Sequence, residues 1–307
     1  MKEVLLAKSA GFCYGVRRAV EQAQQLAQTQ KIYLLGEITH NAHVIAKLEE
    51  LGAVTVHSLE EVPQGATVLI RAHGEPDRVY AQLQEKNCQV VDATCPNVTR
   101  IHDIVRNAAA QGRVPVIVGD PDHPEIVGIA GCAENSVVAA NWEELEKIFQ
   151  NRPELVHQPL TFVSQTTAIR ANWENSVENA KKVCTNAEYF DTICGATSKR
   201  QTEAAQLAGR CDSMIVIGDP KSSNTRRLTQ ICQESCAHVV QVEQADALSP
   251  EDREMFLRHY YYGQSVSEIG AAMGRNPATI KTRLHRGRKK LKELLLERGY
   301  SCEAADL

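Results

Sequence analysis

One short pattern occurs three times in the sequence: an apolar segment, a lone cysteine, and a basic, amphipathic segment. The three copies are VLLAKSAGFCYGVRRAV, QVVDATCPNVTRIHDIV and EYFDTICGATSKRQTEA. Each apolar segment is typical of a short strand, and each segment after the cysteine is typical of a helix. If the copies are equivalent, a pseudo-threefold arrangement brings the thiolates of Cys13, Cys95 and Cys194 to one centre.

Cysteine usage favours thiols or metal ligands over disulfides. The chain has 10 cysteines but no C-x-x-C pair and no secretory signal, which is typical of a reducing compartment and disfavours a zinc ribbon. No apolar run approaches the roughly 18 residues of a membrane span. We therefore expect a cytoplasmic protein without a membrane partner, in which the other seven cysteines are small core residues.

Polar residues follow the apolar strand segments up to about residue 248. Strand segments alternate there with helical periodicity, which predicts an α/β fold with buried parallel strands. Ligands of such open sheets bind at the carboxyl ends of the strands. The polar residues at these ends are His40, His73, His123 with Glu125, Thr166 with Thr167, and Ser222, Ser223 and Asn224. Their recurrence after five strands indicates a binding site.

The residue types at these positions suit distinct chemical tasks. Three thiolates suit an iron-sulfur cluster, and a four-iron cluster held by three thiolates leaves one iron open as a Lewis acid. Imidazole, hydroxyl and amide groups, some at the start of a helix, suit an anion such as phosphate. Glu125 beside His123 suits proton delivery, because desolvation holds a carboxyl protonated near neutral pH. Together these groups predict reduction of a phosphorylated alcohol with loss of water.

Residues 1 to about 248 resemble the LytB/IspH family of 4-hydroxy-3-methylbut-2-enyl diphosphate reductases, which act in the methylerythritol phosphate route to isoprenoids. The resemblance rests on eight motifs in the family's order: GFCYGVRRAV, LGEITHN, RAHGEP, VDATCP, GDPDHPE, VSQTT, TICGAT and GDPKSSNT. It implies three pseudo-threefold-related α/β lobes with parallel sheets, at about 1–94, 95–193 and 194–248. The third lobe is expected to be truncated.

The resemblance also implies a ligand set and a reaction. Cys13, Cys95 and Cys194 would hold a 4Fe-4S cluster between the lobes. Glu125, Thr166 and His123 would act on protons near the substrate hydroxyl. The diphosphate would be bound by His40, His73, His123, Ser222, Ser223 and Asn224. The implied reaction is reductive dehydroxylation to isopentenyl and dimethylallyl diphosphate, with two electrons from a ferredoxin or flavodoxin.

The chain departs from the family pattern after Leu248. Members of the family continue into a last strand, a Gly-Ala-Ser-rich loop whose serine completes the diphosphate site, and a closing helix. Here residues 249–307 have a different composition, with eight basic residues and no acidic one between Arg275 and Lys292. We therefore expect the third lobe to lack one strand and one anion ligand.

Residues 249–307 carry the signals of a helix-turn-helix. Ser249-Pro250-Glu251 can start a helix, Ser265 and Glu268 form a capping-box pattern, Gly274 suits a turn, and Asn276-Pro277 can start a third, basic helix. The segment resembles region four of bacterial sigma factors, which implies DNA and RNA polymerase as partners. The candidate DNA contacts are Arg275, Thr279, Lys281, Thr282, Arg283, His285 and Arg286.

Two further interpretations remain open beside the reductase. In the first, a cluster-bearing domain senses redox state or an isoprenoid intermediate and controls DNA binding by the C-terminal helices. In the second, the fusion of the two segments impairs the activity of both. Enzymatic turnover separates the reductase from these alternatives.

Overall fold

The computed structural model describes residues 5–242, 250–256, 258–259 and 264–297 of the chain. The chain falls into two compact units. The larger comprises Cys13–Ser198 and Lys221–Arg227, and the smaller comprises Met1–Phe12, Lys199–Pro220 and Leu228–Leu307. Helices α8 and α9 begin in the larger unit and end in the smaller one.

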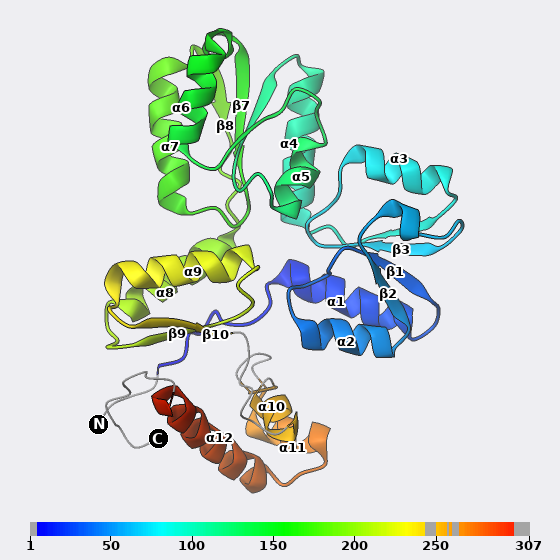
Figure 1. Ribbon diagram of the computed structural model, residues 1–307, viewed down its shortest axis with the longest axis vertical. Coiled ribbons are helices and arrows are strands. Elements are labelled where there is room, and N and C mark those ends of the chain that lie inside the picture. The colour runs from blue at the N-terminus through cyan, green and yellow to red at the C-terminus, as the bar shows by residue number, and fades with distance from the viewer. Residues whose placement is uncertain (1–4, 243–249, 257, 260–263, 298–307) are drawn as a thin grey trace. The chain divides into compact units, whose positions relative to one another are not determined.

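The first sheet has four parallel strands in the order β2-β1-β3-β4. Helices α1 and α2 lie on one face and α3 lies on the other (Figure 1). The strands are β1 (Ile32–Leu35), β2 (Ala53–Val56), β3 (Thr67–Ile70) and β4 (Gln89–Asp92), and the helices are α1 (Tyr14–Ala27), α2 (Ala42–Glu50), the 3-10 helix η1 (Leu59–Glu61) and α3 (Asp77–Glu85). Every residue of β3 is buried, as the apolar run TVLI predicts.

The second sheet repeats this plan, with the order β6-β5-β7-β8 and parallel strands throughout. Helices α4 and α5 lie on one face, and α6 and α7 lie on the other (Figure 1). The strands are β5 (Val114–Val118), β6 (Val137–Ala139), β7 (Pro159–Ser164) and β8 (Asn186–Tyr189), and the helices are α4 (Pro96–Ala110), α5 (Pro124–Ala130), α6 (Trp142–Asn151), η2 (Pro153–His157) and α7 (Arg170–Val183). The identical strand order supports the interpretation of repeated units.

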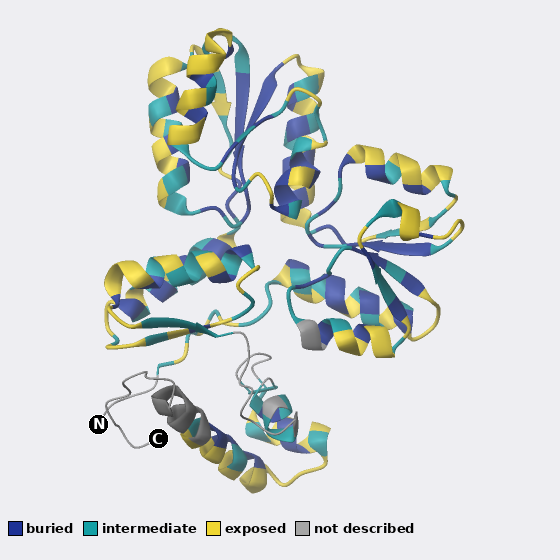
Figure 2. Ribbon diagram, viewed as in Figure 1, coloured by how far each residue is buried: buried dark blue, intermediate teal, exposed yellow. Residues whose placement is uncertain are grey.

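The third sheet contains two strands within the described part of the chain, in the order β10-β9. The elements are α8 (Gly195–Ala208), β9 (Met214–Ile217), α9 (Ser223–Ser235) and β10 (Val239–Val242). Val216 packs with Cys232 and Cys236 under the helices. On the other face, Ile215 and Ile217 are 48% and 73% exposed, and Figure 2 shows this sheet far less buried than the other two. The pair matches β2-β1 and β6-β5, so counterparts of β3 and β7 are missing from the described residues.

The strand that we expected before Cys13 is not present among residues 5–12. In the first two sheets the fourth strand leads into the next cysteine, β4 into Cys95 and β8 into Cys194. By this rule, the segment before Cys13 would be the fourth strand of the third sheet. It belongs to the same compact unit as β9 and β10. A strand needs a neighbour for its backbone hydrogen bonds, and the described residues supply no third strand beside it.

The C-terminal segment forms helices α10 (Pro250–Phe256), α11 (Val266–Met273) and α12 (Pro277–Glu297). The expected capping box is present, because the hydroxyl of Ser265 accepts from the N–H of Glu268 and the carboxylate of Glu268 accepts from the N–H of Ser265. Gly274 ends α11 with a φ of 61°, which favours glycine. The helices pack around four buried residues, Met255, Ile269, Ile280 and Leu284. None of the helices in the described ranges is long and apolar enough to cross a membrane.

Candidate active site

The three repeat cysteines each stand immediately before a helix. Cys13 and Cys95 are the N-cap residues of α1 and α4, and Cys194 directly precedes α8. A Cβ placed on Gly15 would lie 2.7 Å from Sγ of Cys95, so the glycine lets α1 come into contact with that thiol. The side-chain amide of Asn97 donates to Sγ of Cys194 at 3.2 Å. The three cysteines are therefore joined through their nearest neighbours.

The three thiols are close enough to influence one another electrostatically. Burial raises the pKa of the Cys95 thiol, and the nearby charges of Cys13 and Cys194 raise it further, against the backbone N–H groups of Asn97 and Val98. All three thiols are free and partly exposed. Among the described residues, no three Cys, His, Asp or Glu side chains converge on a single metal ion. A four-iron cluster needs no such convergence, because each thiolate binds a different iron.

The chain before Cys13 is held by the helix that follows Cys194. The carboxylate of Glu203 accepts from the N–H of Lys8 at 2.6 Å and from the N–H and hydroxyl of Ser9. The guanidinium of Arg200 donates to the carbonyl groups of Ser9 and Gly11 at 2.9 and 2.6 Å. These contacts fix the segment that leads into α1 without any strand pairing.

Three histidines from three strand ends gather in the larger unit. The ring centroids of His40 and His73 are 6.4 Å apart, and those of His73 and His123 are 5.2 Å apart. Nδ1 of His40 lies 3.1 Å from the carboxylate of Glu37. Nδ1 of His123 accepts from the N–H of Glu125 at 3.1 Å. Nδ1 of His73 is buried and has no hydrogen-bond partner in the described structure, so it is available to a ligand.

Burial keeps two of these imidazoles neutral. It lowers the pKa of His73 well below its ordinary value, and the charges of His123 and Arg71 add to the effect. Burial also lowers the pKa of His123 to about 4, although Asp120 opposes the shift. A bound anion would reverse these shifts, because it stabilises the protonated ring.

Glu125 and Thr166 form a buried pair at the carboxyl end of β7. Glu125 is 2% exposed. Its two carboxylate oxygens accept from the N–H and the hydroxyl of Thr166, each at 2.6 Å. Burial raises the pKa of Glu125, although the two hydrogen bonds from Thr166 oppose the rise. The pair therefore combines a carboxyl that favours its protonated form with a hydroxyl in direct contact.

The Ser-Ser-Asn segment lies at the start of α9, as predicted. The hydroxyl of Ser222 accepts from the N–H of Thr225 at 3.4 Å, and the buried hydroxyl of Ser223 lies 3.0 Å from that of Thr167. Arg226 and Asp120 form an ion pair at 3.1 Å. These contacts hold the first turn of α9, including Asn224, within the larger unit.

Sequence reasoning missed two residues beside this site. The guanidinium of Arg71 occupies the place where a Cβ of Gly36 would stand, at 2.6 Å from Nη1, and Gly36 has a φ of +73°. Arg71 also pairs with Glu75 at 3.3 Å. The side-chain carbonyl of Gln165 accepts from the N–H of Asp120 at 3.1 Å, while its amide nitrogen has no partner in the described structure. Arg71 lies inside the motif RAHGEP and Gln165 inside the motif VSQTT. Their positions in these motifs could have marked them as site residues.

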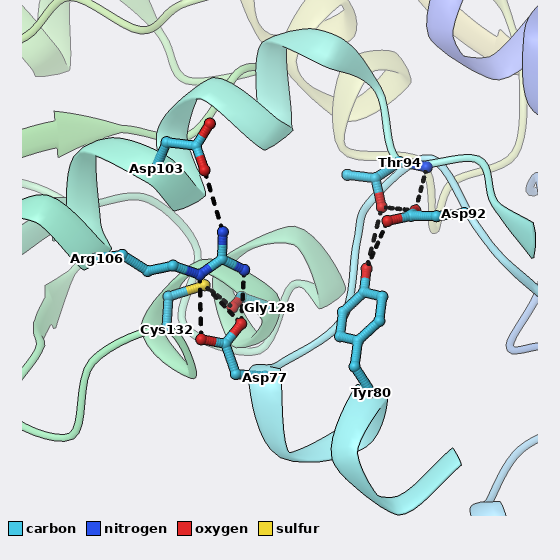
Figure 3. A network of polar contacts seen from close by, with 8 residues as sticks. All are labelled: Asp77, Tyr80, Asp92, Thr94, Asp103, Arg106, Gly128 and Cys132. Atoms are coloured by element: carbon cyan, nitrogen blue, oxygen red, sulfur yellow. Dashed lines mark hydrogen bonds and ion pairs between the residues drawn. The ribbon is translucent and has the colours of Figure 1, made fainter. Parts of the chain in front are cut away.

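A polar network supports the loop that carries Cys95 (Figure 3). Asp92 accepts from the N–H of Thr94 at 2.8 Å and from the hydroxyl of Tyr80 at 3.2 Å. Beside it, Arg106 pairs with Asp77 at 2.6 Å and with Asp103 at 3.2 Å. The carboxylates of Asp77, Asp92 and Asp103 therefore all have hydrogen-bond or ion-pair partners within the protein.

The candidate DNA contacts fall into two groups. Thr279, Lys281, Thr282, His285 and Arg286 are exposed on α12. Arg283 instead pairs with Glu251 at 2.6 Å and with Asp252 at 2.7 Å on α10, and Arg275 pairs with Glu251 at 3.0 Å. The hydrogen bonds to Asp252 and Glu251 raise the pKa of Arg283. Arg283 thus holds α12 against α10.

Comparison with known proteins identifies the family of the chain. The profile of the LytB protein family matches residues 4–268, and that of sigma-70 region 4 matches residues 246–293. The chain therefore belongs to the LytB family, and it carries a C-terminal segment similar to sigma-70 region 4. The fold class predicted from the sequence is confirmed.

Individual relatives share most of the chain. The protein named 4-hydroxy-3-methylbut-2-enyl diphosphate reductase of Caldanaerobacter subterraneus subsp. tengcongensis is 39% identical over 255 residues, covering 81% of this chain and 86% of the relative. The protein of that name from Geobacter metallireducens is 38% identical over 274 residues, covering 89% and 91%. The structure of the E-1-hydroxy-2-methyl-but-2-enyl-4-diphosphate reductase of Plasmodium falciparum matches with a TM-score of 0.73 at 29% identity, covering 82% of this chain and 78% of that one.

The raised pKa of Glu125 predicts a pH dependence of stability that depends on this carboxyl. A carboxyl whose pKa is raised by folding contributes stability that is present below its unfolded pKa and is lost as the pH rises through the folded value. The unfolding free energy of the wild-type protein should therefore fall relative to that of Glu125→Gln as the pH rises. Chemical denaturation of both proteins at a series of pH values, starting below the ordinary pKa of a glutamate, measures the difference in unfolding free energy. A difference that does not change with pH would contradict the buried, proton-holding carboxyl.

Proposed function

We propose that the chain reduces 4-hydroxy-3-methylbut-2-enyl diphosphate to isopentenyl and dimethylallyl diphosphate, with a 4Fe-4S cluster held by Cys13, Cys95 and Cys194. The observation that carries the proposal is the Glu125–Thr166 pair, a buried carboxyl with a raised pKa beside three clustered histidines in the same unit as the cysteines. Family membership supports the same reaction.

The residues present fit such a cluster. Three free thiols stand at equivalent places before three helices, and the absence of a side chain at Gly15 leaves room beside Cys95. The three thiolates would repel one another, and iron ions bound to them would relieve this repulsion. When bound, a 4Fe-4S cluster with three protein ligands supplies the electrons of the reduction and a Lewis-acidic iron.

The diphosphate is bound in this proposal by donors that are uncharged in the free protein. Imidazole, hydroxyl and amide groups come from His40, His73, His123, Ser222, Ser223 and Asn224, and the start of the 13-residue helix α9 favours an anion. Because burial lowers the pKa of His73 in the free protein, the anion is bound with uptake of a proton near neutral pH. Because burial keeps His73 and His123 neutral before binding, the free protein avoids the cost of burying unpaired charge.

Glu125 supplies a proton in the proposed reaction. Removal of the hydroxyl as water consumes two electrons and two protons, one for the water and one for the allylic unit that remains. The second proton goes to the carbon that loses the C–O bond in dimethylallyl diphosphate, and to the other end of the allylic unit in isopentenyl diphosphate. A carboxyl oxygen of Glu125 lies 2.6 Å from the hydroxyl oxygen of Thr166. When Glu125 is protonated, it can donate across this contact to Thr166, and Thr166 then donates its own proton to the leaving oxygen. Desolvation maintains the protonated state that this step requires.

Turnover under anaerobic conditions tests this proposal. The chain with its cluster, supplied with reduced methyl viologen and the substrate, should form both diphosphate products. Glu125→Gln should keep the cluster and turn over at least about 100-fold more slowly, whereas the exposed control Glu174→Gln should match the wild type. A chain that carries a full cluster but does not turn over the substrate would contradict the reductase proposal. The sensor and the impaired fusion would then be the interpretations left.

We also propose that the C-terminal helices bind DNA. The match to sigma-70 region 4 and the exposed basic residues Lys281 and Arg286 on α12 support this second activity. Phosphate contacts release counterions, so the affinity should fall steeply with salt. If the segment reads bases, it would do so as other helix-turn-helix modules do, with its last helix in the major groove of DNA. RNA polymerase is the protein partner that the similarity to sigma-70 region 4 suggests.

Charge removal distinguishes DNA contacts from structural arginines. In the full chain, Lys281→Ala and Arg286→Ala should each weaken duplex binding and reduce its salt dependence, whereas the exposed control Lys147→Ala on α6 should do neither. Arg283→Ala should instead speed amide exchange in α10 and α12, because it removes the ion pairs to Glu251 and Asp252. Equal binding by all variants in a fluorescence titration would contradict the proposal.

A further inference from the structure

A buried histidine on α4 has no role in the reaction proposed above. His102 is 3% exposed, and its Nε2 has no hydrogen-bond partner in the described part of the chain. Burial lowers the pKa of His102 to about 4, helped by the charge of Arg106 and opposed by three nearby aspartates. The imidazole is therefore neutral at neutral pH.

The ring of His102 packs against the turn that carries His73. Gly74 follows His73, and a Cβ placed on Gly74 would lie 2.8 Å from Cε1 and 3.2 Å from Nε2 of His102. The same Cβ would lie 3.1 Å from Cγ2 of Thr94. Gly74 has a φ of +72°, and its N–H donates to the carbonyl of Arg71 at 3.0 Å. The imidazole and the methyl group of Thr94 are therefore in close contact with the backbone of this turn.

The same turn also contacts α5. A Cβ placed on Gly128 would lie 3.3 Å from both the carbonyl carbon and the carbonyl oxygen of Gly74. Helix α5 begins after its N-cap residue His123, whose ring centroid lies 5.2 Å from that of His73. The backbone at Gly74 is therefore packed against both α4 and α5, and its position sets how the two imidazoles face each other.

His102 belongs to the helix that starts at a cysteine of the proposed cluster. Cys95 is the N-cap of α4, and His102 follows seven residues, about two helical turns, later. Thr94, the other side chain against Gly74, directly precedes Cys95. The segment that carries this thiol therefore also supports the turn that carries His73.

We propose that His102 is a positioning residue that fixes the His73 turn, residues 71–76, for diphosphate binding. The inference rests on the proposed function, because it assigns support for the diphosphate site of that reaction. Without the ring, the turn has room to move, and the unpartnered Nδ1 of His73 no longer keeps its place beside His123. Because Nε2 of His102 has no partner, the ring acts through its shape. His102 acts through Gly74 and takes no part in proton transfer.

Pyrophosphate binding to the anaerobically purified full-length chain tests the positioning role. His102→Ala should bind pyrophosphate at least about tenfold more weakly in calorimetry, because the hydrogen bond from the His73 turn to the anion is lost. His102→Leu keeps a buried side chain of similar size and should retain most of the affinity. The control Val137→Ala makes a cavity in the core of the second sheet and should bind like the wild type.

Two results of this titration would overturn the role. One is equal affinity in His102→Ala and the wild type, and the other is an equal loss in His102→Ala and His102→Leu. If His102→Ala does not fold, the partial truncation His102→Val is compared with His102→Leu in the same way.

Amide exchange separates this inference from the proposed function. In the ligand-free protein, His102→Ala should exchange the amides of residues 71–76 faster than the wild type, whereas Val137→Ala should not. Unchanged exchange of these amides in His102→Ala would overturn the inference. A wild type that does not bind pyrophosphate would contradict the diphosphate site of the proposed function, and the exchange rates would still report on His102.

Turnover driven by reduced methyl viologen gives a third readout. The KM of His102→Ala should rise while its kcat changes less, because Glu125 and Thr166 keep their contact. A loss of folded protein alone would instead lower the apparent kcat at an unchanged KM, and that result would count against positioning.

Discussion

The contact between α1 and the Cys95 loop is the constraint on which the rest of the site depends. Gly15 has no side chain, and this absence lets the helix that begins after Cys13 reach Sγ of Cys95. Asn97, two residues later, donates to the sulfur of Cys194. A larger residue at position 15 would collide with the thiol, so this glycine is required by close approach. The first two sheets have the same parallel strand order, and in each the fourth strand leads into the next cysteine, β4 into Cys95 and β8 into Cys194.

The polar site works because burial opposes charge on its central groups. His73 and His123 have lowered pKa values and Glu125 has a raised one, and desolvation is the main cause in each case. In the free site, burial therefore favours the uncharged form of all three groups. In the proposed function, such a site would gain protons when the anion enters, and Glu125 would supply the proton that a leaving hydroxyl needs. Arg71, set against Gly36 and paired with Glu75, places a cationic group next to these neutral histidines.

Local patterns predicted what depends on local structure. The parallel strands, the cysteines before helices and the Ser265–Glu268 capping box all follow from short-range periodicity and capping chemistry. Features that arise from long-range packing could not be predicted. The pairing of Arg283 with Asp252 joins residues 31 positions apart, so a residue that we predicted to contact DNA pairs with a neighbouring helix. The expected strand before Cys13 is absent from residues 5–12 because strand formation depends on a partner, which local sequence does not report.

The central claim is that the three repeat cysteines hold one cluster. Iron and sulfide analysis of anaerobically purified protein, together with Mössbauer spectroscopy, tests it most directly. The account predicts about four irons per chain in the wild type and in the control Cys184→Ser. It predicts loss of the intact cluster in each of Cys13→Ser, Cys95→Ser and Cys194→Ser. A full four-iron cluster in all three of these single variants would contradict the account.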